Sequence, residues 1–294
     1  MQSPREMQKR IQTIENIGQL TRALQAVSAS QVRTSRVLAD NTRAYIVLAW
    51  QILADLYHER EFYHKMKIFD SPDLSKPALI VFISADRGLA GSFPTNIFKT
   101  VIELDRKLNV PVQYITIGKK GRDMLQRRRK KIIADFSELS TVSSFHDLKA
   151  MAAIVLEDFE KGLFGQAYIV YTEYESMSKF TPTVKQLLPF SDSVNGEQEI
   201  STPFHRGGCI YEGDPDVIMH SLLTRFIRME LFHAITSSKA SEHTSRMLAM
   251  NQATENSEEI LASLNLEFNK IRQLRITNDI LDIIGGSSAD CQHF

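Results

Sequence analysis

The segment ADRGLAGSF, residues 85–93, is the first place where the sequence could do chemistry, because a glycine-containing turn between a strand and a helix can bind a phosphate. The segment lacks both G-x-G-x-x-G and the G-K-S/T ending of a phosphate-binding loop, and no acidic partner for a ribose can be placed. A tight structural turn is therefore the favoured interpretation. A nucleotide cradle is the alternative.

The run QRRRKK, residues 126–131, is a candidate nucleic-acid patch. It contains no aromatic residues, and the whole chain is neutral, with 35 basic and 35 acidic residues. A solvated helix end or a contact with an acidic partner is favoured instead.

The remaining reactive residue types form no recognisable site. The histidine pairs His58 with His64 and His220 with His233 lack the i, i+4 spacing of a helical metal site. Cys209 and Cys291 are expected to be free thiols. Since no nucleophile, base and orienting group can be named together, we expect no active site, no cofactor and no bound metal.

The totals predict a folded intracellular protein. A chain of 294 residues with 43% apolar content can bury the core of one large or two ordinary domains. No run approaches the roughly 20 apolar residues of a membrane span. Ser3, Pro4 and Glu6 form a capping box that begins a helix at once, so no secretory leader is expected.

The first 70 residues predict one long helix. Between Pro4 and Pro72 the only helix breaker is Gly18. Apolar residues recur at alternating spacings of three and four, which predicts a coiled-coil seam with polar interruptions at Gln31, Thr34 and Asn41. The expected seam consists of Ile17, Leu20, Leu24, Val27, Leu38, Tyr45, Leu48 and Ile52.

A second long helix is expected from Pro215, with Asp214 as its N-cap, to the glycines 285 and 286. The residues from Asp216 to Ile284 contain no glycine or proline and could reach roughly 100 Å as a helix. The expected seam of this helix consists of Ala253, Ile260, Leu264, Ile271, Leu274 and Leu281.

The middle of the chain alternates strands with helices. Strands are predicted at 78–85, 110–118, near Ile132 and at 166–174, with helices at 95–108, 122–129 and 145–164 between them. Residues 181–190 are expected to add an edge strand, and a polar loop follows. This order predicts a mostly parallel, Rossmann-like sheet with helices on its faces.

The simplest arrangement lays the two terminal helices antiparallel. The fold class is then α/β plus a long antiparallel coiled coil, with an N-terminal coiled-coil helix at 1–70, a central α/β domain at 76–200 and a C-terminal coiled-coil helix at 209–286. The apolar segment ITNDILDIIGG, residues 276–286, would project beyond the helix pair and need burial in another molecule.

Three segments in the right order resemble the gamma subunit of the F-type ATP synthase, the central rotor shaft. They are RIQTIENIGQLTRALQAVSAS near the N-terminus, ISADRGLAGSFPTNI with GKKGRDMLQRRR in the centre, and SEHTSRMLAMNQATENSEEI with LNLEFNKIRQLRITNDILDIIGG near the C-terminus. The resemblance spans essentially the whole chain. It implies a non-catalytic subunit that couples rotation of the ion-driven c-ring to ATP synthesis or hydrolysis.

The resemblance also implies partner contacts. Arg272, Gln273 and Thr277 match the shaft residues that meet the catch loops of the beta subunits, and Leu24 matches the facing position of the N-terminal helix. The residues that would turn in the apolar bearing of the alpha and beta hexamer are Ile280, Leu281, Ile283 and Ile284.

Tyr211 and Glu212 match the foot that rests on the c-ring beside the epsilon subunit. The family implies one copy per complex, no nucleic-acid partner, and a peripheral position on the cytoplasmic face of the bacterial plasma membrane.

The sequence departs from the family pattern at several positions. Leu24 and Ala26 stand where methionine is usual, Gln31 stands where lysine is usual, and Ala90 begins the segment that usually reads Cys-Gly. These departures concern the details of gripping and regulation. They favour a divergent bacterial branch.

Two other classes of function remain as alternatives. A nucleotide-binding α/β enzyme with a helical dimerisation arm would bind ATP, ADP or NAD by itself. A coiled-coil scaffold would form a stable homodimer, whereas a shaft would be recovered with alpha and beta subunits.

Overall fold

The computed structural model describes residues 4–58, 72–137, 145–190 and 215–290. Two helices dominate it, α1 with 55 residues and α6 with 76 residues. The helices are α1 (Pro4–His58), α3 (Phe93–Leu108), α4 (Lys119–Arg127), the short 3-10 helix η3 (Phe145–Leu148), α5 (Lys149–Glu160) and α6 (Pro215–Asp290). The strands are β1 (Ala78–Ile83), β2 (Val112–Ile117), β3 (Lys131–Asp135), β4 (Gln166–Tyr174) and β5 (Phe180–Leu188).

The chain forms two compact units, and both long helices contribute to each. Unit 1 contains residues 1–28 and 247–294, and unit 2 contains residues 29–246. The predicted fold class is confirmed: a mostly parallel sheet is accompanied by long N- and C-terminal helices.

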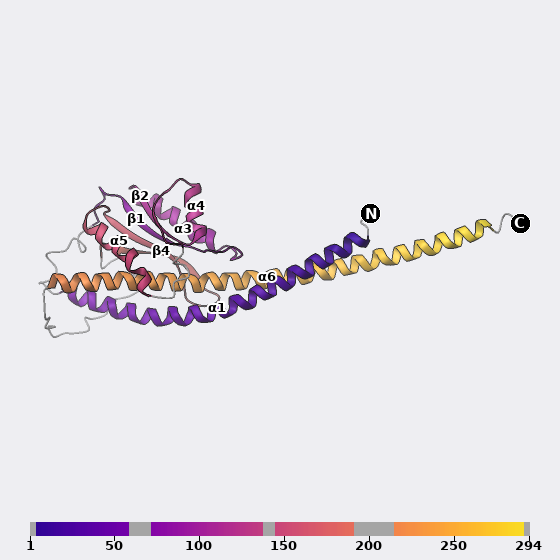
Figure 1. Cartoon of the computed structure of the whole chain (residues 1–294), viewed down its shortest axis with the longest axis horizontal. Coiled ribbons are helices and arrows are strands. Elements are labelled where there is room, and N and C mark those ends of the chain that lie inside the picture. Colours follow the sequence, from indigo (N-terminus) through magenta and orange to yellow (C-terminus); the bar gives the residue numbers. More distant parts are fainter. Residues whose placement is uncertain (1–3, 59–71, 138–144, 191–214, 291–294) are drawn as a thin grey trace. The chain divides into compact units, whose positions relative to one another are not determined.

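The sheet of unit 2 has the strand order β3-β2-β1-β4-β5 (Figure 1). The first four strands are parallel. β5 is the edge strand that the sequence predicts, and it pairs antiparallel with β4. All six side chains of the central strand β1 are buried, which explains its unbroken apolar sequence.

Two apolar clusters cover the two faces of this sheet. On one face, α5 and the first turns of α6 pack against Leu79 and Val81 of β1. On the other face, Ile97 and Val101 of α3 and Leu125 of α4 pack against the strands. The amphipathic helices of the middle region therefore make the three-layer core that their apolar spacing predicts.

Hydroxyl groups of α6 continue the hydrogen bonding of the sheet where a strand ends. The pairing of β1 with β4 stops at Phe82 and Val170, but β4 runs on to Tyr174. The Ser237 hydroxyl accepts the Tyr174 backbone N–H at 2.7 Å, and Ser241 donates to the Thr172 carbonyl at 3.3 Å. Both serines are fully buried, so α6 takes the place of a neighbouring strand there.

In unit 1, the first turns of α1 run antiparallel to α6. The hydroxyl oxygens of Thr21 and Thr254 lie 2.8 Å apart, and the Gln25 amide donates to Asn251 at 2.8 Å. The buried or half-buried positions follow spacings of three and four in both helices. They are Pro4, Met7, Ile11, Ile14, Gly18, Thr21, Gln25 and Ser28 in α1, and Met247, Met250, Thr254, Ser257, Leu261, Leu264, Phe268 and Ile271 in α6.

The coiled coil is therefore present, but most of the residues that the sequence predicted for its seam do not lie in it. Ile17, Leu20 and Val27 are 43%, 60% and 55% exposed, and Leu24 is half-buried. In α6, Leu264 and Ile271 do lie in the observed seam and Ala253 is half-buried, whereas Ile260, Leu274 and Leu281 are exposed. The reason is that α1 carries two heptad series one residue apart, and the larger apolar side chains belong to the series that is not buried.

The same shift holds for the part of α1 in unit 2. Val32, Ala39 and Ile46 are buried, while the predicted Leu38, Tyr45 and Leu48 are exposed. The side chain of Ile52 lies outside the described residues.

Substituting alanine at two helical glycines tests this packing. A Cβ at Gly18 would lie 3.6 Å from the Cβ of Ser257, an ordinary contact. Because alanine is the better helix former, Gly18→Ala should raise the free energy of unfolding by about 0.5–1 kcal/mol. Chemical denaturation of the purified chain measures this change.

The matched control is Gly121→Ala in α4. A Cβ there would lie 2.4 Å from the Ser84 hydroxyl and 2.6 Å from the Phe82 ring, so this variant should be destabilised by roughly 1–3 kcal/mol. If Gly18→Ala were equally destabilising, the 3.6 Å spacing between a Cβ at Gly18 and Ser257, which leaves room for a methyl group, would be refuted.

Candidate partner-contact surfaces

The last part of α6 in unit 1 presents side chains that α1 does not cover. The buried seam ends at Ile271, and every side chain from Arg272 to Leu281 is exposed. Figure 1 shows α6 continuing well beyond the first residues of α1. This stretch is the uncovered tail, residues 272–284.

Polar groups occupy the first part of the uncovered tail. Arg272, Gln273 and Thr277 are all exposed, and Gln273 and Thr277 are four residues apart on one helix face. The Thr277 hydroxyl donates to the Gln273 backbone carbonyl at 3.0 Å. The structure thus brings these three predicted contact residues together.

Leu24 does not lie beside them. The hydrogen bond from Gln25 to Asn251 places Leu24 level with that part of α6. Arg272 lies about 20 residues further along the helix, roughly 30 Å away at 1.5 Å per residue. Any contact that Leu24 makes with a partner is therefore separate from the contacts of Arg272.

Apolar side chains dominate the second part of the uncovered tail. Leu274, Ile276, Ile280, Leu281 and Ile284 are between 48% and 59% exposed. The helix does not end at the glycines 285 and 286, as predicted from the sequence, but continues to Asp290. Both glycines lie inside the helix. Glycine can form the backbone hydrogen bonds of a helix, although it lowers helix stability by about 1 kcal/mol relative to alanine.

The other predicted residues lie outside the described parts of the structure. They are Tyr211 and Glu212 of the expected foot, the side chain of Ile283, and the two cysteines.

The turn at 85–93 is clamped by α6 within unit 2. The Ser245 hydroxyl donates to the Ala90 carbonyl at 2.7 Å, and the Arg246 Nε donates to the Gly88 carbonyl at 3.3 Å. Leu89 and Gly91 both have positive φ values, 63° and 54°. The contacts support a structural turn over a nucleotide cradle.

Sequence reasoning missed this clamp. Ser245 and Arg246 stood out only as part of the family-like segment SEHTSRM. Arg246 is 7% exposed and is held by Glu242, whose carboxylate lies 2.5 Å from its guanidinium. A buried i, i+4 pair of opposite charge is the signal that could have identified it.

The charges around this turn shift several pKa values. Burial, together with the positive charges of Arg246, Lys239 and Arg87, lowers the pKa of His243 to about 4. Its Nδ1 lies 3.3 Å from the Arg246 guanidinium and, when neutral, can accept a hydrogen bond from it. Burial raises the pKa of Asp86 and that of Glu242, and lowers the pKa of Lys239.

The basic run 126–131 is partly used inside unit 2. Arg128 lies over the Phe98 ring at 5.0 Å, and Lys130 pairs with Asp105. Among the residues that the structure describes, no group of three His, Cys, Asp or Glu side chains could hold a metal ion. In the same residues, no helix is both long and apolar enough to span a membrane.

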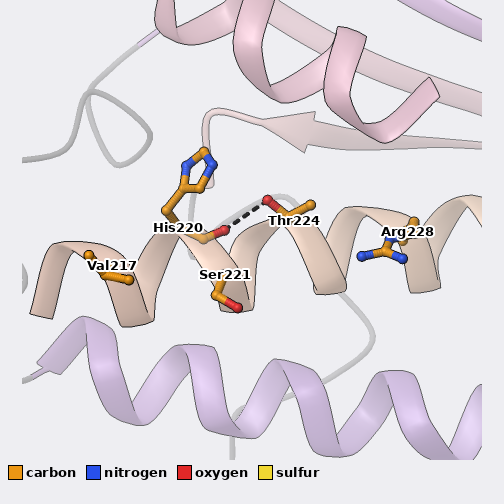
Figure 2. Close-up of a pocket in the computed structure, with 5 residues that line it drawn as sticks. All are labelled: Val217, His220, Ser221, Thr224 and Arg228. Atoms are coloured by element: carbon orange, nitrogen blue, oxygen red, sulfur yellow. Dashed lines mark hydrogen bonds between the residues drawn. The ribbon is translucent and has the colours of Figure 1, made fainter. Parts of the chain in front are cut away.

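A shallow groove of about 510 Å³ follows the first turns of α6 (Figure 2). Its described lining consists of Val217, His220, Ser221, Thr224 and Arg228. Several of the polar groups already have partners: Thr224 donates to the His220 carbonyl at 2.8 Å, and the His220 ring lies 3.2 Å from Glu160. Arg228 stacks over the Phe145 ring at 4.9 Å.

Comparison with known proteins identifies the family. The family model described as ATP synthase matches residues 3–289. The ATP synthase gamma chains of Roseiflexus castenholzii and Dehalococcoides mccartyi (strain CBDB1) are 30% and 32% identical, each over 98% of this chain and 99% of the relative. The chain belongs to the ATP synthase gamma-chain family.

Solved structures share the gamma-chain fold. A chain of the mitochondrial ATP synthase of Euglena gracilis matches with a TM-score of 0.66 at 18% identity, over 97% of this chain and 94% of that one. A chain from the central stalk and c-ring structure of the Tetrahymena thermophila enzyme has a TM-score of 0.61 at 22% identity, over 80% and 99% of the two chains.

The depressed pKa of His243 predicts how the stability of this gamma-family chain changes with pH. The imidazole of His243 binds a proton less readily in the folded state than in the unfolded state. The contribution of neutral His243 to the free energy of unfolding is therefore complete above about pH 6.5 and is lost as the pH falls towards about 4. Asp86 and Glu242, whose pKa values are raised, act in the opposite sense but are retained in the variant.

Replacing His243 by Gln should therefore reduce the loss of unfolding free energy between pH 7 and pH 4.5 by on the order of 1–2 kcal/mol, allowing for partial exposure. Denaturant titrations at the two pH values measure the difference. His220→Gln, at an exposed position, is the control. Equal pH dependence in the His243 variant and the wild-type chain would contradict the assignment.

Proposed function

We propose that this chain is the central-stalk rotor subunit of an F-type ATP synthase. It couples rotation of the c-ring, driven by ion flow, to synthesis or hydrolysis of ATP at the beta subunits. The subunit itself is non-catalytic. Its partners are the alpha and beta hexamer, the epsilon subunit and the c-ring, and it works peripherally at the cytoplasmic face of the bacterial plasma membrane.

One observation carries this proposal: the uncovered tail of α6. Five large apolar side chains there are about half exposed within the chain. Fully burying a side chain of this size contributes roughly 1.5–3 kcal/mol, so the tail gains stability only when another molecule surrounds it. A socket formed by the alpha and beta hexamer would provide that burial.

The apolar character of the tail suits a rotating contact. Hydrophobic burial is non-directional and depends on area, so Ile280, Leu281, Ile283 and Ile284 can turn in an apolar sleeve without breaking a fixed set of hydrogen bonds. We assign these four residues to the bearing.

The polar residues that precede the bearing residues in α6 suit a gripping contact. Arg272 offers five N–H donors in a planar fork, and Gln273 and Thr277 add an amide and a hydroxyl. Such groups form directional bonds with carboxylates and carbonyls, and these bonds change as the helix turns. We assign Arg272, Gln273 and Thr277 to the catch loops of the beta subunits, and Leu24 to a separate contact along α1.

Rotation affects catalysis through differences in these contacts. Each orientation of the shaft presents a different face to each beta subunit. A bound partner shifts a conformational equilibrium only by its difference in affinity for the two states. The asymmetric arrangement of Arg272 and Gln273 on one helix supplies such a difference without any catalytic group in this chain.

These roles assign each of the three segments of the chain to a part of the rotor. The coiled-coil segments 1–70 and 209–286 form the shaft, and the α/β domain 76–200 links it to the foot. Tyr211 and Glu212 are assigned to the contact with the c-ring beside epsilon.

Replacing Arg272 and Gln273 together by Ala tests the gripping contact. Both side chains are exposed, so the helicity of the purified chain should not change. Loss of the directional bonds should lower ATP-driven proton pumping in inverted membrane vesicles roughly tenfold, which corresponds to about 1.4 kcal/mol. Replacing the exposed residues Glu259 and Ser263 together by Ala is the control. Undiminished pumping by an assembled Arg272/Gln273 variant would defeat the assignment.

Replacing Ile280 by Asp tests the bearing. A carboxylate in an apolar sleeve carries a desolvation cost of several kcal/mol, so recovery of the chain with alpha and beta subunits should fall strongly. Val217→Asp, at an apolar position near the start of α6 that is 66% exposed against 50% for Ile280, should leave recovery unchanged. Normal assembly and turnover of the Ile280 variant would argue against a socket around the tail.

A further inference from the structure

His233 of α6 is a buried histidine of unit 2 with a polar partner at each ring nitrogen. Its side chain is 8% exposed, and its Nε2 atom lies 3.3 Å from the Oε1 atom of Glu173 in β4. Its Nδ1 atom lies 3.3 Å from the hydroxyl oxygen of Thr42 in α1. All three residues belong to unit 2. A single imidazole ring therefore connects α1 with the sheet.

The Thr42 hydroxyl presents lone pairs to this ring, because its proton is used elsewhere. A hydroxyl has only one proton to donate. The Thr42 oxygen lies 2.9 Å from the Ala39 carbonyl oxygen and 3.1 Å from that of Leu38, both in its own helix. Both distances are shorter than the 3.3 Å to His233. The proton therefore goes to these carbonyls, and the hydroxyl oxygen accepts from Nδ1.

The Glu173 carboxylate is an acceptor as well. Burial by itself would raise the pKa of Glu173, but the hydrogen bond and the charge of His233 hold it below its usual range. The Tyr171 hydroxyl helps by donating to the Oε2 atom of Glu173 at 2.5 Å. Burial, followed by the charge of Glu173, holds the pKa of Tyr171 well above its usual range, so this hydroxyl keeps its proton. An ionised carboxylate can only accept hydrogen bonds.

We propose that His233 is a positively charged positioning residue that holds α1 to the α/β domain. With an acceptor facing each ring nitrogen, both nitrogens carry a proton, which is the imidazolium form. When the proton on Nδ1 passes to water, the lone pair left there faces the lone pairs of the Thr42 oxygen, and the bond to α1 is lost. The bond from Nε2 to Glu173 remains. The connection is therefore complete while the ring is charged and is lost as the pH rises and the ring releases its proton.

The other charged groups around the ring favour a positive charge on it. Glu230, one helical turn before His233 in α6, is 1% exposed and pairs with Lys185 of β5 at 2.7 Å. Glu173 and Glu230 together carry two negative charges against the one positive charge of Lys185, so an imidazolium makes the cluster neutral. Arg43 of α1 is exposed, and water screens its charge.

The bond to Thr42 matters for the seam of α1. Thr42 lies between Ala39 and Ile46, which are both buried. Loss of the bond therefore weakens the packing of this part of α1. In a rotor, the connection makes α1 turn with the α/β domain. This last consequence rests on the proposed function, whereas the charge of His233 does not.

Nitrogen NMR of the full chain labelled with ¹⁵N-histidine tests the charge. At about pH 7.5 an isolated histidine, with a pKa near 6.5, is mostly neutral. Both ring nitrogens of His233 should nevertheless give the chemical shifts of protonated nitrogen, and Glu173→Gln should make the ring neutral at the same pH. The signal is assigned by its absence in His233→Gln or, if that variant does not fold, by its displacement in Thr42→Val.

Hydrogen exchange tests the connection to α1. In the wild-type chain, the protection of backbone amides around Thr42 should fall roughly tenfold between about pH 7 and about pH 9, after correction for faster chemical exchange, because a bond from a charged donor is lost. Thr42→Val should show the low protection already at about pH 7, with no further fall. Thr42→Ser keeps the acceptor and should behave as the wild type. Thr34→Val is the control, because exposed Thr34 makes the same kind of bond to its own helix, at 3.4 Å from the Ser30 carbonyl.

Two results would overturn the inference. A ring nitrogen of His233 without a proton at about pH 7.5 would refute the charge. Protection around Thr42 that is independent of pH, or that changes equally in Thr42→Val, would refute the connection. Both results leave the proposed function standing, because they are measured on this chain alone. Failure of the chain to co-purify with alpha and beta subunits would instead refute the proposed function and leave the charge of His233 unaffected.

Discussion

The close antiparallel contact between α1 and α6 in unit 1 is the constraint on which the account depends. Its centre is made of small and hydroxyl-bearing residues, with Gly18 against Ser257 and Thr21 against Thr254. Small side chains let two helix backbones approach closely. The buried hydroxyls of Thr21 and Thr254, each of which also lies within hydrogen-bond distance of a carbonyl of its own helix, meet in only one register of the two helices. A pair of helices held in one register resists relative sliding, which is the mechanical property that a shaft requires.

The same residue types anchor α6 to the sheet in unit 2. Ser237 and Ser241 complete the backbone hydrogen bonds of β4, and Ser245 and Arg246 hold the turn that follows β1. Each contact joins a side chain of α6 to main-chain atoms of the α/β domain, so a turning force on the domain passes to the helix through hydrogen bonds of fixed direction. The helix itself is continuous from Pro215 to Asp290.

Much of the fold could be predicted because hydrophobic periodicity reports the type of each element. The strands, the helices between them and the presence of an edge strand follow from apolar runs and spacing. The seam could not be predicted in the same way. Gly18, Thr21 and Ser28 contribute little hydrophobicity, whereas Ile17, Leu20 and Val27 contribute much, so a pattern based on apolar residues selects the exposed face. Ser245 was missed because the partner it holds is a backbone carbonyl, which leaves no mark in a sequence. For Arg246 the only sequence signal is its i, i+4 spacing from Glu242. Arg272, Gln273 and Thr277 were found through family resemblance, since nothing in their spacing distinguishes a gripping surface from a solvated one.

A disulfide between α1 and α6 tests most directly whether the two helices turn as one shaft. In a chain with Cys209 and Cys291 replaced by Ser, Thr21→Cys and Thr254→Cys would place two thiols at the buried hydroxyl pair, and Leu20→Cys with Ile260→Cys would place two at exposed positions. The account predicts that mild oxidation links the first pair but not the second, and that the linked complex still pumps protons when it hydrolyses ATP. Failure of the first pair to form a disulfide, or a loss of pumping that reduction restores, would contradict it.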